Sequence, residues 1–323
     1  MQGRHMRDVN VLSLFDGISC GQLALKRAGI GVNHYFASEI DKKAMAVTQY
    51  HFPNTTQLGD VVDVKGRDLP KIDLVIGGSP CQGFSRSGGR LHFDDPRSRL
   101  FFEYVRLIEE TDPKYFLLEN VVMREDSRDV ITSILGVEPV LINSSDFSAQ
   151  TRRRHYWTNI PFDKDYEPKN VLLRDVLEPY YHSEDISDDE IERQISALLA
   201  TSKYHHTFKW RRDTANRVLV MRPDGLKIQR IGRVGFGSNK SELCTVRVVP
   251  HVFDGKTIRP VNPLEAERLQ TLPDNYTAVN DMATTTRHRM IGNCWTVDVI
   301  AHILRGIDRC CGGVGDPGDC QCR

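Results

Sequence analysis

The 323-residue chain has no apolar stretch long enough to cross a bilayer, and its 43 basic and 43 acidic residues leave a formal net charge of zero. A membrane-spanning helix needs about 20 apolar residues. The segment from Met1 to Val11 has a basic start but lacks the apolar segment of a secretory signal. These absences exclude a helical membrane protein, and we expect an intracellular, cytoplasmic location.

The eight cysteines do not form a disulfide framework. Cys20, Cys81, Cys244 and Cys294 are scattered among apparent core or motif segments, and the other four lie in the glycine-rich tail 310–323. The tail contains no histidine, and its spacing fits no standard zinc finger. We therefore expect no metal site and a flexible tail.

A net charge of zero at first argues against a nucleic-acid partner, but the charge is unevenly distributed. Acidic residues dominate 163–193, whereas basic residues dominate 203–259. Contacts to phosphates require such a local basic surface. The same residues could also form the solvated face of a small domain, so charge alone leaves both interpretations open.

The first 160 residues alternate between apolar runs and helical patterns. The apolar runs are Val9 to Phe15, Tyr35 to Glu39, Asp73 to Gly77, Tyr115 to Glu119, Val140 to Ile142 and Tyr156 to Ile160. Helical patterns lie between them, and the first ends at Gly29. This alternation predicts an α/β fold with a doubly wound, mostly parallel sheet.

Polar residues fall where several of these strands end. Asp16, Glu39, Cys81 and the pair Glu119-Asn120 each follow an apolar run. Sheets of this kind bind ligands outside the carboxyl ends of their strands, so we expect a ligand site there.

The pattern changes after Pro161, where an acidic helical stretch at 188–199 precedes short apolar runs at Val218 to Met221 and Leu243 to Val249. Helical patterns return at Pro263 to Gln270 and Thr296 to Arg305. We predict a catalytic domain at 1–160, an inserted smaller domain at 161–257 and a return to the catalytic domain at 258–309.

A turn and an acidic side chain suit a nucleotide-like ligand. The turn from Phe15 to Gly21 opens a helix whose amides can face a ligand, although it lacks the third glycine of a dinucleotide fingerprint. Glu39, about 20 residues further on, could bind ribose hydroxyls. An ordinary turn and a helix cap are the alternatives for the turn and for Glu39.

Cys81 lies in Ser79-Pro80-Cys81-Gln82-Gly83, directly after an apolar strand. Most cysteines are small buried hydrophobic residues. Here the flanking proline and glycine indicate a turn that presents the thiol at the ligand end of the sheet.

Glu119 ends an apolar strand, where a neutral carboxyl group could donate a hydrogen bond to a ligand. Arg152 and Arg154 would share one face of a strand, so that both guanidinium groups point into one site. A cap or ion pair is the alternative for Glu119, and solvated charge for the arginines.

Together these segments resemble the ordered motifs of the DNA (cytosine-5)-methyltransferase family, of bacterial or phage type, with some similarity to the animal de novo DNA methyltransferases. The resemblance covers Leu14 to Ile160 and Arg259 to about Leu304, and Pro-Cys-Gln, Glu-Asn-Val and Gln-X-Arg-X-Arg in this order carry it. It implies a target-recognition domain at 161–257, a methyl donor, S-adenosylmethionine, and a partner, double-stranded DNA. The compactness of the chain suggests an enzyme of a bacterial or phage-infected host cell, where such enzymes belong to restriction-modification systems. The sequence does not give the oligomeric state, and we favour a monomer.

The resemblance also assigns roles. Cys81 would attack C6 of a flipped cytosine, Glu119 would hold N3 and the exocyclic amine, and Arg154, supported by Arg152, would contact O2. The residues implied to bind the cofactor are Phe15, Asp16, Gly17, Ile18, Glu39, Ile40, Asp60, Val61, Pro80, Leu100, Asn293 and Trp295. Among these, Glu39 would bind ribose, Asp60 the adenine amine, and Ile40 and Val61 the two faces of the adenine ring. The residues implied to contact DNA are Gln82, Ser85, Arg86, Arg90, Arg97, Arg99, Arg230 and Arg233.

Two alternatives stay open. One branch of the family methylates tRNA with the same core motifs, although its Cys-Phe-Thr signature is absent here. A catalytically inactive DNA-binding relative is the other. The inserted region matches no recognition domain that would identify the target sequence.

Overall fold

The computed structural model describes residues 8–79, 99–171, 175–178, 189, 193, 209–212, 218–221, 251–253 and 258–309. The chain divides into two compact units. The first consists of Met1–Asn143, Arg153–Glu167 and Trp295–Arg323, and the second of Ser144–Arg152 and Pro168–Cys294. The first unit thus resumes at Trp295, whereas the sequence boundaries put this return at 258.

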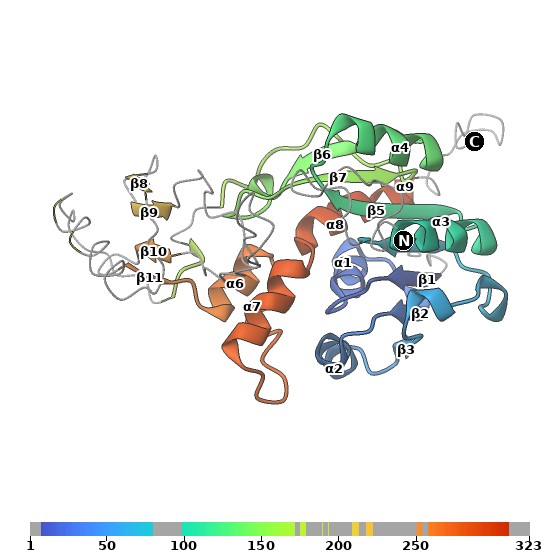
Figure 1. Cartoon of the computed structure of the whole chain (residues 1–323), viewed down its shortest axis with the longest axis horizontal. Helices are drawn as coiled ribbons and strands as arrows, with labels where there is room; N and C mark the ends of the chain where they lie inside the picture. The colour runs from blue at the N-terminus through green and yellow to red at the C-terminus, as the bar shows by residue number, and fades with distance from the viewer. Residues whose placement is uncertain are drawn as a thin grey trace, which may run out of the picture. The chain divides into compact units, whose positions relative to one another are not determined.

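The first unit contains a seven-stranded sheet of order β3-β2-β1-β4-β5-β7-β6 (Figure 1). Its strands are β1 (Val9–Leu14), β2 (Val32–Ser38), β3 (Thr56–Gln57), β4 (Leu74–Gly77), β5 (Tyr115–Val121), β6 (Val140–Asn143) and β7 (Arg153–Thr158). Pairing is parallel from β3 to β5, and β7 runs antiparallel to both β5 and β6. The predicted mostly parallel α/β sheet is confirmed.

Helices cover both faces of this sheet. They are α1 (Cys20–Ala28), α2 (Lys42–His51), α3 (Arg99–Thr111), α4 (Glu125–Leu135), α8 (Val297–Leu304) and α9 (Gly306–Arg309), with the 3₁₀ turns η1 (Val61–Asp63) and η2 (Gly66–Asp68). Consecutive strand residues point to opposite faces. Accordingly, a Cβ at Gly21 of α1 would lie 2.4 Å from Ile76, and one at Gly77 would lie 2.9 Å from Tyr104 of α3. Helix α1 packs with α8 on one face, and α3 covers the other.

Local sequence explains where these helices begin and end. Helix α1 ends at Gly29, which has a φ of 80° and donates its amide to the carbonyls of Leu25 and Lys26. Helix α2 begins after Asp41, whose carboxylate accepts from the amide of Lys43.

Strand β5 is longer than the sequence indicated. It continues to Val121, because β7 pairs Tyr156 with Glu119 and His155 with Asn120. Glu119, the last residue of the predicted strand, and Asn120, which was expected to follow it, therefore both lie inside the strand. Strand β7 correspondingly begins at Arg153, three residues before the predicted start at Tyr156.

The second unit contains an antiparallel four-stranded sheet of order β11-β10-β9-β8. Its elements are η3 (Ser144–Asp146), β8 (Lys209–Arg212), β9 (Val218–Met221), β10 (His251–Phe253), β11 (Ile258–Pro260), α6 (Pro263–Leu269) and α7 (Thr284–Asn293). Asn262 and Glu265 form a capping box that begins α6. The sequence did not indicate α7, which begins with three threonines.

The run Val218–Met221 is a strand, as predicted. The predicted helix at 188–199, apart from residues 189 and 193, and the predicted strand at 243–249 lie outside the described residues, as does the tail 310–323. No described helix combines the length and apolar character that crossing a membrane requires.

Candidate active site and cofactor site

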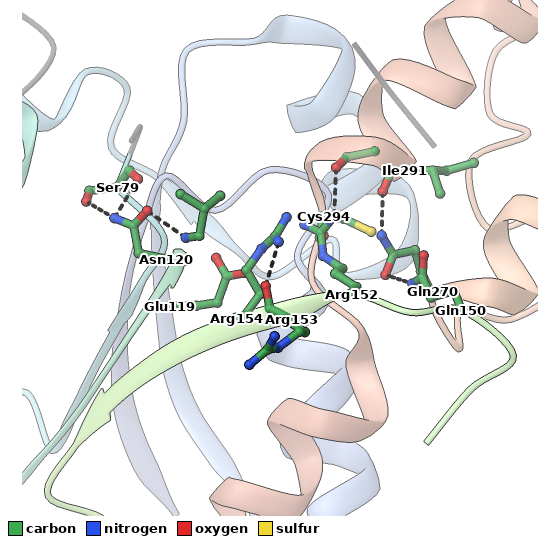
Figure 2. A network of polar contacts seen from close by, with 12 residues as sticks. Ser79, Glu119, Asn120, Gln150, Arg152, Arg153, Arg154, Gln270, Ile291 and Cys294 are labelled. Carbon is green, nitrogen blue, oxygen red and sulfur yellow. Dashed lines mark hydrogen bonds and ion pairs between the residues drawn. The ribbon is translucent and has the colours of Figure 1, made fainter. Parts of the chain in front are cut away.

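Glu119 and Arg154 form an ion pair between adjacent strands (Figure 2). The Nε atom of Arg154 lies 2.8 Å from Oε1 of Glu119, and their side chains are only 14% and 10% exposed. Arg154 also donates to the carbonyl of Arg153. The sequence predicted apolar surroundings for Glu119, but the structure supplies a cation. Both side chains are thereby held in fixed orientations.

Gly78 lies against this pair. A Cβ at Gly78 would lie 3.4 Å from Oε2 of Glu119 and 3.0 Å from the indole nitrogen of Trp295. The backbone after β4, the Glu119 carboxyl group and Trp295 therefore come together within the first unit. A side chain at position 78 would displace one of these neighbours.

Asn120 holds the start of the segment that leads to Cys81. Its Nδ2 atom lies 3.4 Å from the hydroxyl oxygen and 3.5 Å from the carbonyl oxygen of Ser79, and Asn120 and Ser79 are both buried. Its Oδ1 atom accepts from the amide of Val121. These long contacts place the Asn120 amide beside the residue that precedes Pro80.

Several predicted site residues lie outside the described residues. They are Pro80, Cys81, Gln82, Ser85, Arg86, Arg90, Arg97, Arg230 and Arg233. Arg99, the first residue of α3, is described and is exposed.

Arg152 has different partners from Arg154. It precedes β7, and its guanidinium group donates to the carbonyls of Gly292, at 3.4 Å, and Cys294, at 3.0 Å, at the end of α7. Arg152 lies just before the strand, so strand alternation does not govern its direction. That both guanidinium groups point into one site stays a prediction.

Gln150 belongs to the same polar network of the second unit (Figure 2). Its Nε2 atom donates to the carbonyl of Leu269 at 2.8 Å and to Oε1 of Gln270 at 2.6 Å. Gln270 in turn donates to the carbonyl of Ile291 at 3.1 Å. The motif residues Gln150 and Arg152 thus connect the segment 144–152 to α6 and α7.

Glu39 is held by three backbone amides at the end of β2. Its Oε2 atom accepts from the amide of Gly17 at 2.8 Å, and Oε1 accepts from the amides of Ile40 and Asp41, each at 2.8 Å. Asp41, not Glu39, caps α2. Because an oxygen of a carboxylate can accept two hydrogen bonds, Oε2 retains capacity for a ligand hydroxyl.

Apolar and acidic groups are exposed near the ends of β2 and β3. The Ile40 side chain is 70% exposed. Asp60 is exposed and caps η1, with Oδ1 accepting from the amide of Val62 at 3.2 Å. These side chains are accessible to a ligand, and the cofactor roles that the resemblance implies for them stay predictions.

Val61 does not present the surface that its predicted role requires. It is 3% exposed and packs in the core with Phe101, whereas its neighbour Val62 is 54% exposed. Ile18 is also buried, at 1%. A 3₁₀ turn rotates successive side chains by about 120°, so the sequence alone does not tell which of two adjacent valines faces the core.

The remaining predicted cofactor residues have varied environments. Phe15 and Leu100 are partly buried and pack against the core of the first unit. Trp295 is 9% exposed, in the first unit, whereas Asn293 is an exposed residue at the end of α7, in the second.

Three hydroxyl groups surround Asp16, and the sequence did not predict them. They belong to Ser13, Ser19 and Tyr35. The available signal was Ser13, a polar residue inside the otherwise apolar strand β1.

A family model described as C-5 cytosine-specific DNA methylase matches residues 9–309. The chain belongs to this family. This methylase is 28% identical over 335 residues to the type II methyltransferase M.NgoPII of Neisseria gonorrhoeae, a match that covers 93% of this chain and 96% of that one. It is 36% identical over 190 residues to the orphan methyltransferase M.SPRI of Bacillus phage SPR, a match that covers 52% of this chain and 43% of the phage enzyme.

Solved structures show the same fold. The Entamoeba histolytica methyltransferase EhMeth matches with a TM-score of 0.64 and 16% identity, over 94% of this methylase and 99% of that chain. The S. pombe Dnmt2 methyltransferase matches with a TM-score of 0.62 and 17% identity, over 94% and 100% of the two chains. The predicted family is confirmed by the family model.

Methylases of this family use S-adenosylmethionine as methyl donor, and the first unit fits such a ligand. Glu39 offers an acceptor beside Gly17, Ile40 offers an exposed apolar side chain, and Asp60 offers an exposed carboxylate. These groups match the hydroxyl groups, the aromatic ring and the amine of an adenosine moiety.

Proposed function

We propose that this chain methylates C5 of a cytosine in double-stranded DNA through a covalent bond between the Cys81 sulfur and C6 of a flipped base. The observation that carries the proposal is the Glu119–Arg154 pair, which lies beside Gly78, three residues before Cys81. The Glu119 carboxyl group and the Arg154 guanidinium group, which are far apart in the sequence, therefore lie together beside the segment that leads to the Cys81 thiol.

The chemistry requires these three groups because C6 of cytosine is a weak electrophile. A thiolate adds to C6 only if the charge that develops toward N3 is stabilised, which is the role proposed for Glu119. Arg154 positions Glu119 and offers donors to O2 of the base. Arg152, bound to the end of α7, supports the segment that leads into β7 instead of contacting the base.

The target base lies inside a stacked duplex and must be extruded, at a cost of about a few kcal/mol. We assign the compensating contacts with DNA to the predicted set Gln82, Ser85, Arg86, Arg90, Arg97, Arg99, Arg230 and Arg233. Arginine side chains suit this role because they bind phosphates.

Glu39, Ile40 and Asp60 would hold S-adenosylmethionine through its ribose, the face of its adenine ring and its adenine amine. When bound, the cofactor supplies an electrophilic methyl group to the carbon that the Cys81 addition activates. Loss of the C5 proton and departure of the Cys81 sulfur then restore the aromatic ring.

DNA that contains 5-fluorocytosine tests the covalent step, because fluorine at C5 prevents the loss that releases the sulfur. We expect the wild-type chain, supplied with S-adenosylmethionine, to form a denaturation-resistant adduct with this DNA. Cys81→Ser should form none and should lose methyl transfer, while binding S-adenosylhomocysteine nearly as the wild type does. Cys320→Ser, which alters a tail thiol, is the matched control and should form the adduct.

Full methyl transfer by Cys81→Ser would eliminate the covalent mechanism. If the wild type binds S-adenosylhomocysteine but forms no adduct with any 5-fluorocytosine duplex, the chain is an inactive relative.

A further inference from the structure

Asp16 lies among three hydroxyl groups behind the loop that precedes α1. Oδ1 accepts from the hydroxyls of Ser13, at 2.7 Å, and Tyr35, at 2.8 Å, and Oδ2 accepts from that of Ser19, at 2.7 Å. Ser13, Ser19 and Tyr35 are each no more than 4% exposed. An ionised carboxylate can accept from all three hydroxyls at once, so this arrangement suits the ionised form of Asp16.

The backbone of this loop is strained. Phe15, Gly17 and Ser19 have φ values of 59°, 62° and 60°, a region that phenylalanine and serine rarely adopt. Ser19 occupies the position before α1, where a serine normally caps the helix through its side chain, but it makes no such bond. Its hydroxyl binds Asp16 instead. The carboxylate therefore replaces the usual cap as the restraint on Ser19.

The restraint extends in two directions. Ser19 Oγ accepts from Nε2 of Gln22 at 2.9 Å, and the same nitrogen donates to the hydroxyl of Thr55 at 2.8 Å. On the other side, the amide of Gly17, the residue after Asp16, donates to Oε2 of Glu39 at 2.8 Å. The conformation of the loop thus determines where Gly17 meets the carboxylate that is proposed to bind ribose.

The pKa of Asp16 lies close to neutral pH, so a small fall in pH protonates part of this carboxylate. Burial raises the pKa of Asp16 to about 6, the hydroxyls of Ser19, Ser13 and Tyr35 oppose this shift, and the charge of Glu39 adds to it. Burial, followed by the charge of Asp16, raises the pKa of Tyr35 well above its ordinary value, so this hydroxyl stays a donor. Tyr35 and Glu39 are the titratable side chains that act on Asp16 among the described residues.

We propose that Asp16 is a positioning residue whose ionised carboxylate, held by Ser13, Ser19 and Tyr35, keeps the loop in the shape that binds S-adenosylmethionine. Protonation of Asp16 removes one acceptor site from the carboxylate, so one of the three hydroxyls loses its hydrogen bond. The strained backbone at Ser19 is then less well restrained. Cofactor affinity therefore falls as the pH falls through the titration of Asp16. This inference rests on the proposed cofactor site at Glu39, Ile40 and Asp60.

The test is the dissociation constant of S-adenosylhomocysteine, measured by calorimetry with the full chain between about pH 5 and pH 8. One group with a pKa of about 6 should weaken binding about tenfold from pH 7 to pH 5. Asp16→Asn keeps the size of the side chain, and we expect it to bind more weakly at pH 7 with a flat pH profile. Circular dichroism verifies that this variant is folded.

Two further variants should move the midpoint in opposite directions. Tyr35→Phe removes a hydrogen bond that lowers the Asp16 pKa, so the midpoint should rise; Glu39→Gln removes a charge that raises it, so the midpoint should fall while overall affinity decreases. Tyr50→Phe alters a tyrosine that is 69% exposed and should match the wild type.

The outcomes separate the two proposals. No binding of S-adenosylhomocysteine at any pH would overturn the proposed cofactor site. Tight binding with a flat wild-type profile, or a profile that Glu39→Gln abolishes while Asp16→Asn retains it, would overturn the role of Asp16.

Discussion

Glu119 shows how much a single neighbour changes a residue. In the sequence it follows three apolar residues, which suggested a carboxyl group in apolar surroundings. In the fold Arg154 reaches it across the strand pair at 2.8 Å. The guanidinium group fixes the orientation of the carboxyl group and also remains close enough to act on a base that Glu119 binds.

Glu119→Gln should lower the chemical rate far more than DNA affinity. Glutamine has nearly the same size but cannot donate a carboxyl proton, and loss of such a group costs roughly 10²–10⁴-fold in rate. Single-turnover methyl transfer and a DNA-binding titration would give the two effects separately. Glu109→Gln, at an exposed position of α3, is the control. A loss confined to DNA binding would show that Glu119 has another role.

A sequence motif does not predict the environment of each of its side chains. Arg152 and Arg154 are equivalent as letters of one motif, yet one binds carbonyls at the end of α7 and the other binds Glu119. Val61 and Val62 are chemically identical, and only the first is in the core. Motif spacing therefore did not tell where each of these side chains points.

At the scale of elements, antiparallel β7 brings the site together. It pairs along β5 from Thr158 to Arg154, which extends β5 beyond its apolar core to Val121. The extension carries Glu119 and Asn120 past the end of the parallel strands, next to the backbone at Gly78 and Ser79. An apolar run in the sequence predicts the apolar part of a strand. It does not predict the polar residues that join the strand because they pair with a neighbouring strand.

The helices α6 and α7 depend on a buried ion pair. Glu267 is fully buried, and its Oε1 atom accepts from the amide and hydroxyl of Thr277 and from Arg287 at 2.9 Å. The Arg287 side chain is 15% exposed. Removal of one partner of a buried pair leaves an uncompensated charge, which costs about 3–5 kcal/mol.

Arg287→Met should therefore lower the free energy of unfolding by about 3 kcal/mol, as measured by urea denaturation. Restoring neutrality with the double variant Arg287→Met, Glu267→Gln should recover part of this loss. Arg124→Met removes an exposed pair with Asp126 and should cost less than about 1 kcal/mol. Equal losses in Arg287→Met and Arg124→Met would mean that the buried pair does not stabilise the second unit.

At the scale of the whole molecule, the E. histolytica methyltransferase EhMeth and the S. pombe Dnmt2 methyltransferase share this fold. A shared fold does not by itself identify the nucleic acid that an enzyme modifies. The zero net charge conceals the basic stretch 203–259, most of which lies outside the described residues. Substrate choice is therefore a question for the complete chain.

We expect the full chain to transfer labelled methyl groups to duplex DNA and not to tRNA under matched conditions. The expectation follows from the large basic insert and the absence of the Cys-Phe-Thr signature. Sequencing of methylated cytosines in DNA from expressing cells would then report the recognised bases. If tRNA became labelled and duplex DNA did not, the substrate assignment would be reversed.

The sequence by itself determined the family and the α/β class, and it indicated the segments proposed to form the site. Apolar runs of β4 and β5 must be buried whatever their partners, and a glycine such as Gly29 ends a helix by local sterics, so these features follow from short stretches. The Glu39 position after the second strand and the Pro-Cys-Gln and Glu-Asn-Val motifs are equally local.

Only the tertiary structure decided which side chains meet. The Arg154–Glu119 pair, the separate partners of Arg152, the burial of Val61 and the three hydroxyls around Asp16 all join residues from different elements. Such contacts depend on strand register, on the direction of β7 and on the packing of helices against the sheet. No short stretch of sequence contains that information, because each contact is stabilised by residues far away along the chain.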